Sequence, residues 1–265
     1  MAEVLLLVEE TAGARHAVVT LRHQGKFNAM SRSMWVQLRE VFLRLQQEAL
    51  AADPLRCVVI QGAEGHFCAG GDISEYSGFR FETDSLRHFH ENEVWGGLSA
   101  MLACDAPVIA AIEGNCMGAG VEIASCCDIR LATQGSRYGA PIGKLGFPMA
   151  PREAALVAQA LGPTVARSML LEAGLYDADA MLQRGFLTRL HADGSALKDD
   201  VQQTVARVMR LSPAAARMHK QMMRTWMQAA EPMLDAQCAT AYDYADSPEH
   251  REGITAFIDK RPARF

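Results

Sequence analysis

Two glycine-rich segments, each following an apolar run, could bring backbone N–H groups close to a ligand. They are residues 67–72 (FCAGGD) and residues 114–120 (GNCMGAG). Glycine lets the main chain approach a ligand and adopt conformations closed to larger residues. The second segment leads from a predicted strand into a predicted helix, whose first N–H groups are unpaired and can stabilise an oxyanion. Plain glycine turns are the alternative for both segments.

Glu122 is the one acidic residue in the apolar run Val121–Ala124, just after the second glycine segment. It follows Ala119 by three residues, which places its carboxyl on the same helix face as the Ala119 amide. Burial there would raise its pKa toward the range that is useful for proton transfer. A carboxylate in the first turn of a helix is also favoured by the helix dipole alone, so a structural role stays open.

Cys116 suggests a different chemistry, because G-x-C-x-G between a strand and a helix has the shape of a nucleophile elbow. A cysteine hydrolase would need a base such as His250 and an orienting acid such as Asp177 or Asp179. An α/β-hydrolase should keep strands after the elbow to carry those groups. The chain here turns helical instead, so this is the weaker interpretation.

Strand and helix patterns alternate through the first 191 residues, which predicts an α/β architecture with ligands held at loops beyond the strands. The chain opens with a predicted hairpin, Val4–Glu9 and Ala14–Arg22. The elements that follow are a helix from Ser31 to about Asp53, strand Arg56–Gln61, helix Leu86–Ala103, strand Pro107–Glu113, helix Gly118–Cys127, strand Asp128–Ala132, loop Gly135–Pro148 and helix Pro151–Leu161.

From Ala192 onward the pattern is helical, so we predict an α/β core over residues 1–191 and a helical region over residues 192–265. The expected helices are Leu197–Leu211, Pro213–Ala229, Pro232–Ala245 and Pro248–Lys260. A methionine stripe at helical spacing predicts core packing or a subunit interface; it comprises Met218, Met222, Met223, Met227 and Met233, with Trp226 among them.

Composition excludes several classes of protein. The longest apolar run, Ala106–Ile112, is too short to span a membrane. Seven scattered cysteines indicate a reduced, cytoplasmic protein, and without CxxC or HExxH spacing a metal is not expected. The net charge of −5 and dispersed Lys and Arg argue against nucleic-acid binding.

The two glycine segments stand in the order found in a known family. Together with residues 106–122 (APVIAAIEGNCMGAGVE), 126–132 (CCDIRLA) and 252–265 (EGITAFIDKRPARF), they resemble the crotonase superfamily, the enoyl-CoA hydratase/isomerase family. The resemblance starts at residues 21–30 and covers nearly the whole chain. It implies a spiral of ββα units, a helical C-terminal trimerisation region, a homotrimer or dimer of trimers, and an acyl-CoA substrate of fatty acid metabolism with no metal or redox cofactor.

The resemblance also implies roles for particular residues. The backbone N–H groups of Gly71 and Ala119 would hold the thioester carbonyl in an oxyanion hole, and Glu122 matches the first of two glutamates used by hydratases. The second should follow the proline of FGQPE, but residues 138–142 read YGAPI. Ile142 cannot transfer a proton. Candidates for a replacement group are Glu75, Tyr76, Tyr138, Lys144 and Glu153.

With one carboxylate, the two-glutamate scheme for hydration or dehydration of an enoyl-CoA lacks its second proton-transfer group. A single carboxylate could still move a double bond by carrying a proton between two carbons. Thioester hydrolysis, decarboxylation and a non-catalytic binding role on the same fold are the alternatives.

The phosphates of CoA require local cations on this acidic protein. By resemblance these are Arg22 and Lys26 near the start and Lys260 near the end, with Ala69 and Asp72 beside the first glycine segment. We expect Asp72 chiefly to hold that segment in shape by accepting N–H bonds.

Overall fold

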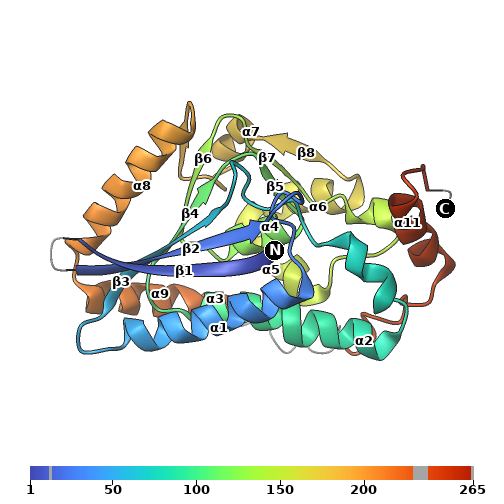
Figure 1. The fold of residues 1–265 in the computed structure, drawn as a ribbon, viewed down its shortest axis with the longest axis horizontal. Helices are drawn as coiled ribbons and strands as arrows, with labels where there is room; N and C mark the ends of the chain where they lie inside the picture. Colours follow the sequence, from blue (N-terminus) through green and yellow to red (C-terminus); the bar gives the residue numbers. More distant parts are fainter. Residues whose placement is uncertain (12–13, 229–237, 264–265) are drawn as a thin grey trace.

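A six-stranded sheet runs through the molecule (Figure 1). The structure is a computed structural model that describes residues 1–11, 14–228 and 238–263. The strand order is β1 (Ala2–Thr11), β2 (Ala14–His23), β3 (Leu55–Gly62), β4 (Val108–Ile112), β6 (Ile129–Thr133) and β9 (Arg189–His191). The first two strands pair antiparallel, and each later neighbour pairs parallel. The predicted hairpin and the three predicted inner strands are therefore confirmed.

Both faces of this sheet are covered, because alternate residues of a strand point to opposite sides. On one side Cys57, Val59 and Ile109 pack against helix α8 (Gly194–Met209). On the other side Val58 and Ile60 belong to the main core together with helix α1 (Arg32–Ala49). Being enclosed from both sides makes β4 buried along its whole length.

Helix α1 forms where its apolar residues recur every three or four positions. Met34, Leu38 and Phe42 are fully buried, and the Ser31 side chain caps the helix by accepting from the Met34 N–H. The helix packs along α3 (Trp95–Ala103). The predicted helix over residues 86–103 is interrupted: α2 (Thr83–His88) passes through a π-helical turn η2 (Phe89–Val94) into α3. Such turns occur frequently at functional sites.

A second sheet of three short strands lies where the sequence analysis predicted no strand. It contains β5 (Asn115–Met117), β7 (Arg137–Gly139) and β8 (Leu175–Asp177). Each is only three residues long, which is too short to show a period of two. The remaining elements around it are helices α4 (Ala119–Ser125), α5 (Pro151–Leu161), α6 (Pro163–Leu171) and α7 (Ala178–Gln183), with 3-10 turns η1 (Ile73–Gly78) and η3 (Ile142–Leu145).

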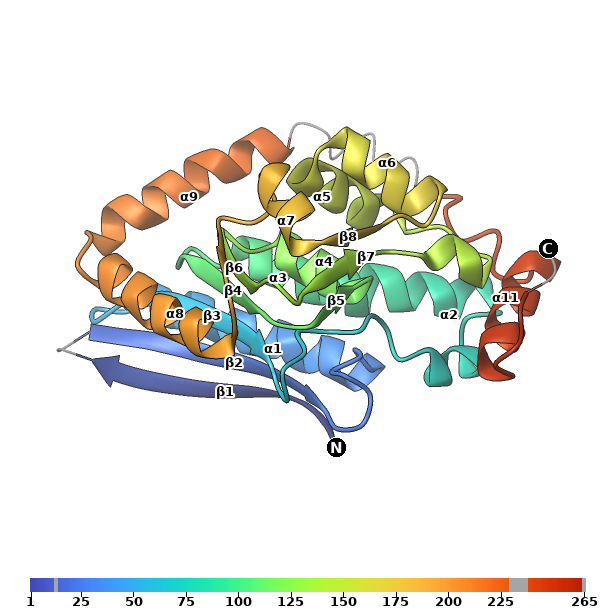
Figure 2. The same cartoon turned by 90° about the horizontal axis from the view of Figure 1, so that it is seen from above.

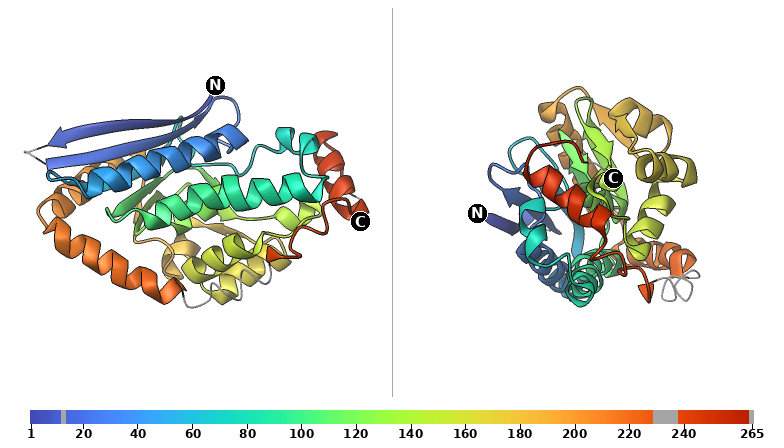
Figure 3. Two further views of the ribbon diagram at one scale, coloured as in Figure 1. Left: turned by 90° about the horizontal axis from the view of Figure 1, so that it is seen from below. Right: turned by 90° about the vertical axis from the view of Figure 1, so that its right-hand side faces the viewer.

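Past residue 191, the described segments 192–228 and 238–263 are helices and turns. They include α8, α9 (Pro213–Gln228) and α11 (Pro248–Ile258). Helix α11 lies at the opposite end of the molecule from α8 and α9, beside the segment that holds η1 and α2 (Figures 2 and 3). The predicted helix Pro232–Ala245 falls partly on residues 229–237, and Met233 wholly so; these lie outside the described residues.

The outer face of α9 carries exposed methionines. Met218, Met222 and Met223 are each at least half exposed, so packing in this chain's own core is the wrong interpretation for them. Their role at a subunit interface remains a prediction. Among the described helices, none combines the length and the apolar character needed to cross a bilayer.

Candidate active site

The two glycine segments lie side by side, although they are almost fifty residues apart in the chain. The Cys68 N–H donates to the Asn115 carbonyl at 2.8 Å, and the Met117 N–H donates to the Cys68 carbonyl at 2.9 Å. Beyond these bonds Gly70 and Gly118 both have positive φ, and a Cβ on Gly118 would lie 3.5 Å from the Gly70 Cα. The positive φ, rather than a lack of space, is what favours glycine at both positions.

Two backbone N–H groups are left unpaired where the segments meet. Neither Gly71 nor Ala119 donates its N–H to an acceptor among the described residues, and both residues line a cavity. Ala119 is the first residue of α4, where a helix offers no internal partner. At Gly71 a side chain is impossible without rearrangement, since a Cβ would lie 2.0 Å from the Tyr76 hydroxyl oxygen.

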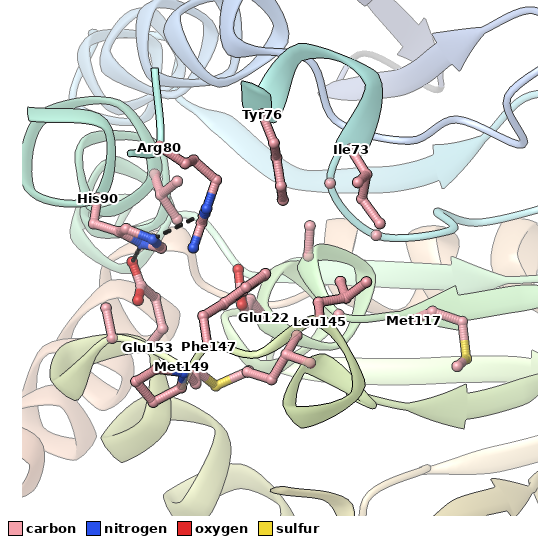
Figure 4. A pocket seen from close by; sticks show the side chains of 18 of the residues that line it. Ile73, Tyr76, Arg80, His90, Met117, Glu122, Leu145, Phe147, Met149 and Glu153 are labelled. Carbon is pink, nitrogen blue, oxygen red and sulfur yellow. Dashed lines mark hydrogen bonds and ion pairs between the residues drawn. The ribbon is translucent and has the colours of Figure 1, made fainter. Parts of the chain in front are cut away.

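The cavity beside these groups has a volume of about 320 Å³ and is mostly apolar (Figure 4). Residues from η1, η2, η3, the start of α5 and helix α11 complete its wall. Such a cavity, with few polar groups converging on it, is typical of small-molecule sites. Its titratable side chains are Tyr76, Arg80, His90, Glu122, Lys144 and Glu153.

Glu122 extends from α4 into this cavity (Figure 4). Its carboxyl makes no hydrogen bond with the described residues, and part of its surface faces the empty space of the cavity rather than bulk water. Burial raises the pKa of Glu122 well above its ordinary value, and the charge of Glu153 raises it further, against a smaller opposing effect of Arg80. The sequence correctly predicted a desolvated acid here.

Glu153 faces the same cavity from the first turn of α5. Its Oε1 lies 3.2 Å from His90 Nδ1, whereas its buried Oε2 has no hydrogen-bond partner. Burial, followed by the charge of Glu91, raises the pKa of Glu153 to about 8, although Arg80 acts in the opposite direction. Two carboxyl groups with raised pKa values therefore meet at one cavity.

Two of the other candidates for a second proton-transfer group, Glu75 and Tyr138, do not line the cavity. Glu75 is half-buried outside the cavity lining, and its carboxylate accepts from the Arg32 backbone N–H at 2.9 Å. Tyr138 is fully buried outside the cavity lining and bonded to Ser136. Tyr76 and Lys144 do line the cavity, as does Ile142 at the position of the expected glutamate.

Arg80 is a cavity residue that sequence reasoning missed. It follows η1 in a turn, and its side chain is 1% exposed. The neighbours that bury it, His90, Tyr244 and His250, come from 10 to 170 residues along the chain. No local pattern marks it, because a single arginine in a polar stretch ordinarily lies in solvent.

Asp72 and Lys26 form one unit beside the first glycine segment. Lys26 Nζ donates to both Asp72 carboxylate oxygens, at 2.9 and 2.7 Å, and Asp72 caps η1 by accepting from the Ser74 N–H. Burial alone would raise the pKa of Asp72, but hydrogen bonds from Lys26 and Ser74 outweigh it and hold the pKa below its ordinary value. This contact fixes the loop that ends at Gly71.

The remaining predicted CoA contacts lie in different places. Ala69 lines the cavity. Arg22, which is half exposed, pairs with Glu3. Lys260 is exposed directly after α11, which contributes Phe257 to the cavity wall.

The cysteine-hydrolase constellation is not assembled. Cys116 is fully buried in strand β5, and burial raises the pKa of its thiol well above the ordinary value. His250 has both ring nitrogens engaged, with the Ala245 carbonyl and with Arg80. Asp177 caps α7. The nucleophile, base and acid of that alternative therefore have no common site.

Comparison with known proteins agrees with this geometry. The family model described as enoyl-CoA hydratase/isomerase matches residues 11–265. A solved structure from Magnetospirillum magneticum, an enoyl-CoA hydratase/carnithine racemase, is 32% identical, covers 100% of this chain and 96% of that one, and superposes with a TM-score of 0.78. A probable enoyl-CoA hydratase of Mycobacterium tuberculosis, EchA14, is 32% identical over 76% of this chain and 72% of the relative. The 2,3-dehydroadipyl-CoA hydratase of Escherichia coli is 28% identical over 95% of both chains.

The family match extends over almost the entire chain, and the two glycine segments occupy adjoining positions at one cavity with an acidic residue beside them. The chain belongs to the enoyl-CoA hydratase/isomerase family, and its fold is the crotonase fold.

Proposed function

We propose that the protein hydrates an enoyl-CoA or moves its double bond, with the thioester carbonyl held by the N–H groups of Gly71 and Ala119. The observation that carries this proposal is the pair of unpaired N–H groups at the cavity that Glu122 enters. Donors already in place stabilise the negative charge that develops on the carbonyl oxygen, and losing one typically costs about 3 kcal/mol of transition-state stabilisation.

Glu122 is the proposed acid/base, and Glu153 supplies the second carboxyl group that Ile142 cannot. Interacting carboxyl groups titrate as a pair, so one can hold a proton while the other accepts one. In hydration a water oxygen adds to the β-carbon and gives one proton to a carboxylate, while the other carboxyl group delivers a proton to the α-carbon. In isomerisation a proton leaves the α-carbon and returns two carbons further along the chain. Neither reaction is a net oxidation or reduction, and the carboxyl groups move the protons, so we propose no metal or redox cofactor.

The CoA moiety enters as part of the substrate. Of the three predicted cations, Lys260 alone makes no ion pair with described residues, which leaves it available to meet a phosphate. Lys26 and Arg22 already have carboxylate partners. We propose that they keep these ion pairs while they contact CoA, together with Ala69 and Asp72. The exposed methionines of α9 support a homotrimer or dimer of trimers. We place the protein in cytoplasmic fatty acid metabolism.

The test is turnover of crotonyl-CoA and 3-hexenoyl-CoA in deuterated water, followed by mass spectrometry. The wild type should give a hydrated or isomerised product with deuterium, and Glu122→Gln should abolish it. Glu172→Gln, which changes an exposed glutamate outside the cavity lining, should leave turnover unchanged.

Other products would overturn the proposal in defined ways. Release of free CoA without addition to the double bond would indicate thioester hydrolysis. No conversion, with CoA thioesters still bound, would contradict hydration and isomerisation of these substrates and leave decarboxylation or a non-catalytic binding role to be tested next.

A further inference from the structure

Arg80 places a buried positive charge in the wall of the cavity. Its side chain is 1% exposed, and the guanidinium points into the cavity from the side where His90 and Glu153 lie (Figure 4). Within 4.0 Å of its nitrogens the described residues offer no carboxylate oxygen. A buried charge without a counter-ion is costly, and proteins rarely keep one unless a partner is supplied.

The groups that do contact Arg80 are uncharged acceptors at long distances. Nη2 donates to the Tyr244 hydroxyl at 3.2 Å, Nη1 lies 3.3 Å from His90 Nε2, and Nε donates to His250 Nε2 at 3.4 Å. Burial, together with the charge of Arg80 itself, lowers the pKa of both histidines, that of His250 to about 4. Neither imidazole supplies charge, and two of the five guanidinium N–H groups have no partner among the described residues.

The two carboxyl groups of the cavity do not take the place of a counter-ion. Arg80 opposes the rise in the pKa of both groups, but burial has the larger effect and holds both pKa values above the ordinary value. Neither carboxylate lies within ion-pair distance of the guanidinium, so Arg80 can still accept a further anion.

Aromatic rings hold the guanidinium in one orientation. Its central carbon lies 3.9 Å from the centre of the Phe147 ring and 4.5 Å from that of Tyr76. Stacking of this kind keeps the planar fork of an arginine preorganised for a planar, bidentate anion. A carboxylate has that shape.

We propose that Arg80 binds a carboxylate at the far end of the acyl chain, so that the preferred substrate is the CoA thioester of a dicarboxylic acid. The inference rests on the proposed function only in placing the thioester carbonyl at Gly71 and Ala119. From there the acyl chain passes Glu122, which lies between Met117 and Arg80 in Figure 4. The apolar walls hold the methylene groups, and Arg80 selects the terminal charge.

Binding of saturated thioesters tests this without any turnover, because they have no double bond to hydrate or move. Calorimetry would compare matched pairs on the wild type: succinyl- with butyryl-CoA, glutaryl- with pentanoyl-CoA, and adipyl- with hexanoyl-CoA. In at least one pair the Kd of the carboxylated member should be about ten- to a hundredfold lower. This ratio corresponds to the free energy that a hydrogen bond to a charged group usually contributes. Equal or weaker binding of the carboxylated member in every pair overturns the inference.

Variants locate the effect. Arg80→Gln should remove the preference for the carboxylated member and leave the apolar member bound as before, while Arg80→Lys should keep part of the preference. Arg44→Gln, which changes an exposed arginine on α1, should keep all of it. If Arg80→Gln does not fold, the wild-type pairs and Arg80→Lys still decide. An equal loss for both members of a pair would assign Arg80 a structural role and overturn the inference.

Failure of the inference and failure of the proposed function give different results. Tight adipyl-CoA binding without turnover of any enoyl-CoA would contradict the proposed reaction and leave the Arg80 site standing. Turnover of crotonyl-CoA and 3-hexenoyl-CoA without any preference for carboxylated ligands would contradict the Arg80 site and leave the proposed reaction standing.

Discussion

Glu122 and Glu153 enter one cavity from two successive helices. Burial raises the pKa of both carboxyl groups, and the charge of Glu153 raises that of Glu122 further. Glu153 lacks the local motif that marked Glu122. Its buried, unpaired Oε2 and its contact with His90 are what distinguish it from a solvated carboxylate at the start of a helix. The replacement of a glutamate by Ile142 thus coincides with a carboxyl group that reaches the cavity from α5.

Glu153→Gln should slow turnover by about 10²- to 10⁴-fold, the range contributed by a positioned acid or base. It should also move the acidic limb of the pH–rate profile to lower pH, because the charge of Glu153 raises the pKa of Glu122 and the variant removes that charge. Profiles of kcat/KM for the wild type and variant, with Glu172→Gln as the control, measure both effects. An unchanged rate and profile would remove Glu153 from the mechanism.

Glu153 should also make stability depend on pH. Its pKa is about 8 in the folded protein against 4.5 for an ordinary glutamate, so between these values the folded state holds a proton that the unfolded state has lost. The stabilisation is complete below about pH 4.5 and is lost as the pH rises through 8, by a few kcal/mol at most. Thermal unfolding from pH 5 to 9 should show a smaller decline in Tm for Glu153→Gln than for the wild type. Parallel curves would contradict the raised pKa.

At the scale of elements, the site depends on the close approach of two loops. The loop ending at Gly71 is held by Lys26 and Asp72, and the loop before α4 is held by strand β5. Gly71→Ala keeps the N–H but puts a Cβ against the Tyr76 hydroxyl. Displacing one oxyanion donor should lower kcat by about 10²- to 10³-fold.

The matched control for this substitution is Gly78→Ala, at the end of η1, where a Cβ would meet nothing within 4 Å. It should leave kcat within a factor of about two, since surface substitutions of this type change little. Similar losses in both variants would show that the effect comes from η1 as a whole and not from the Gly71 position.

The elements that could be predicted from sequence are those long enough to show a period. Helix α1 and the first hairpin have many apolar residues at regular spacing, and Ser31 marks the helix start. The three-residue strands β5, β7 and β8 have no readable period, and the π-helical turn inside residues 83–103 leaves the apolar pattern intact. For the site, the glycine segments and Glu122 were predictable because each lies in a local motif. Arg80 was not, because distant segments bury it.

At the scale of the whole molecule, the helical C-terminal region does two things. Helix α8 covers one face of the main sheet, whereas the segment ending in α11 reaches the far end and closes the cavity with Phe257 (Figure 2). The predicted boundary after residue 191 therefore separates the strands from the helices of the chain but cuts through the wall of the site. That boundary stays a prediction as a division into domains.

The exposed methionines of α9 predict the assembly. Met218→Asp combined with Met223→Asp introduces charges on a face that is at least half exposed in the single chain and should convert a trimer or hexamer into smaller species. Analytical ultracentrifugation measures this. Val36→Asp, at an exposed apolar position on α1, serves as the control. An unchanged mass for the double variant would place the subunit interface elsewhere.

The most direct test of the proposed oxyanion hole is a crystal structure of the protein with hexanoyl-CoA, a thioester that it cannot hydrate or isomerise. We expect the carbonyl oxygen about 2.7–3.1 Å from the N atoms of both Gly71 and Ala119, with the α-carbon beside the Glu122 carboxyl. A carbonyl oxygen bound away from these two N–H groups, with the acyl chain outside the cavity, would contradict the proposed site.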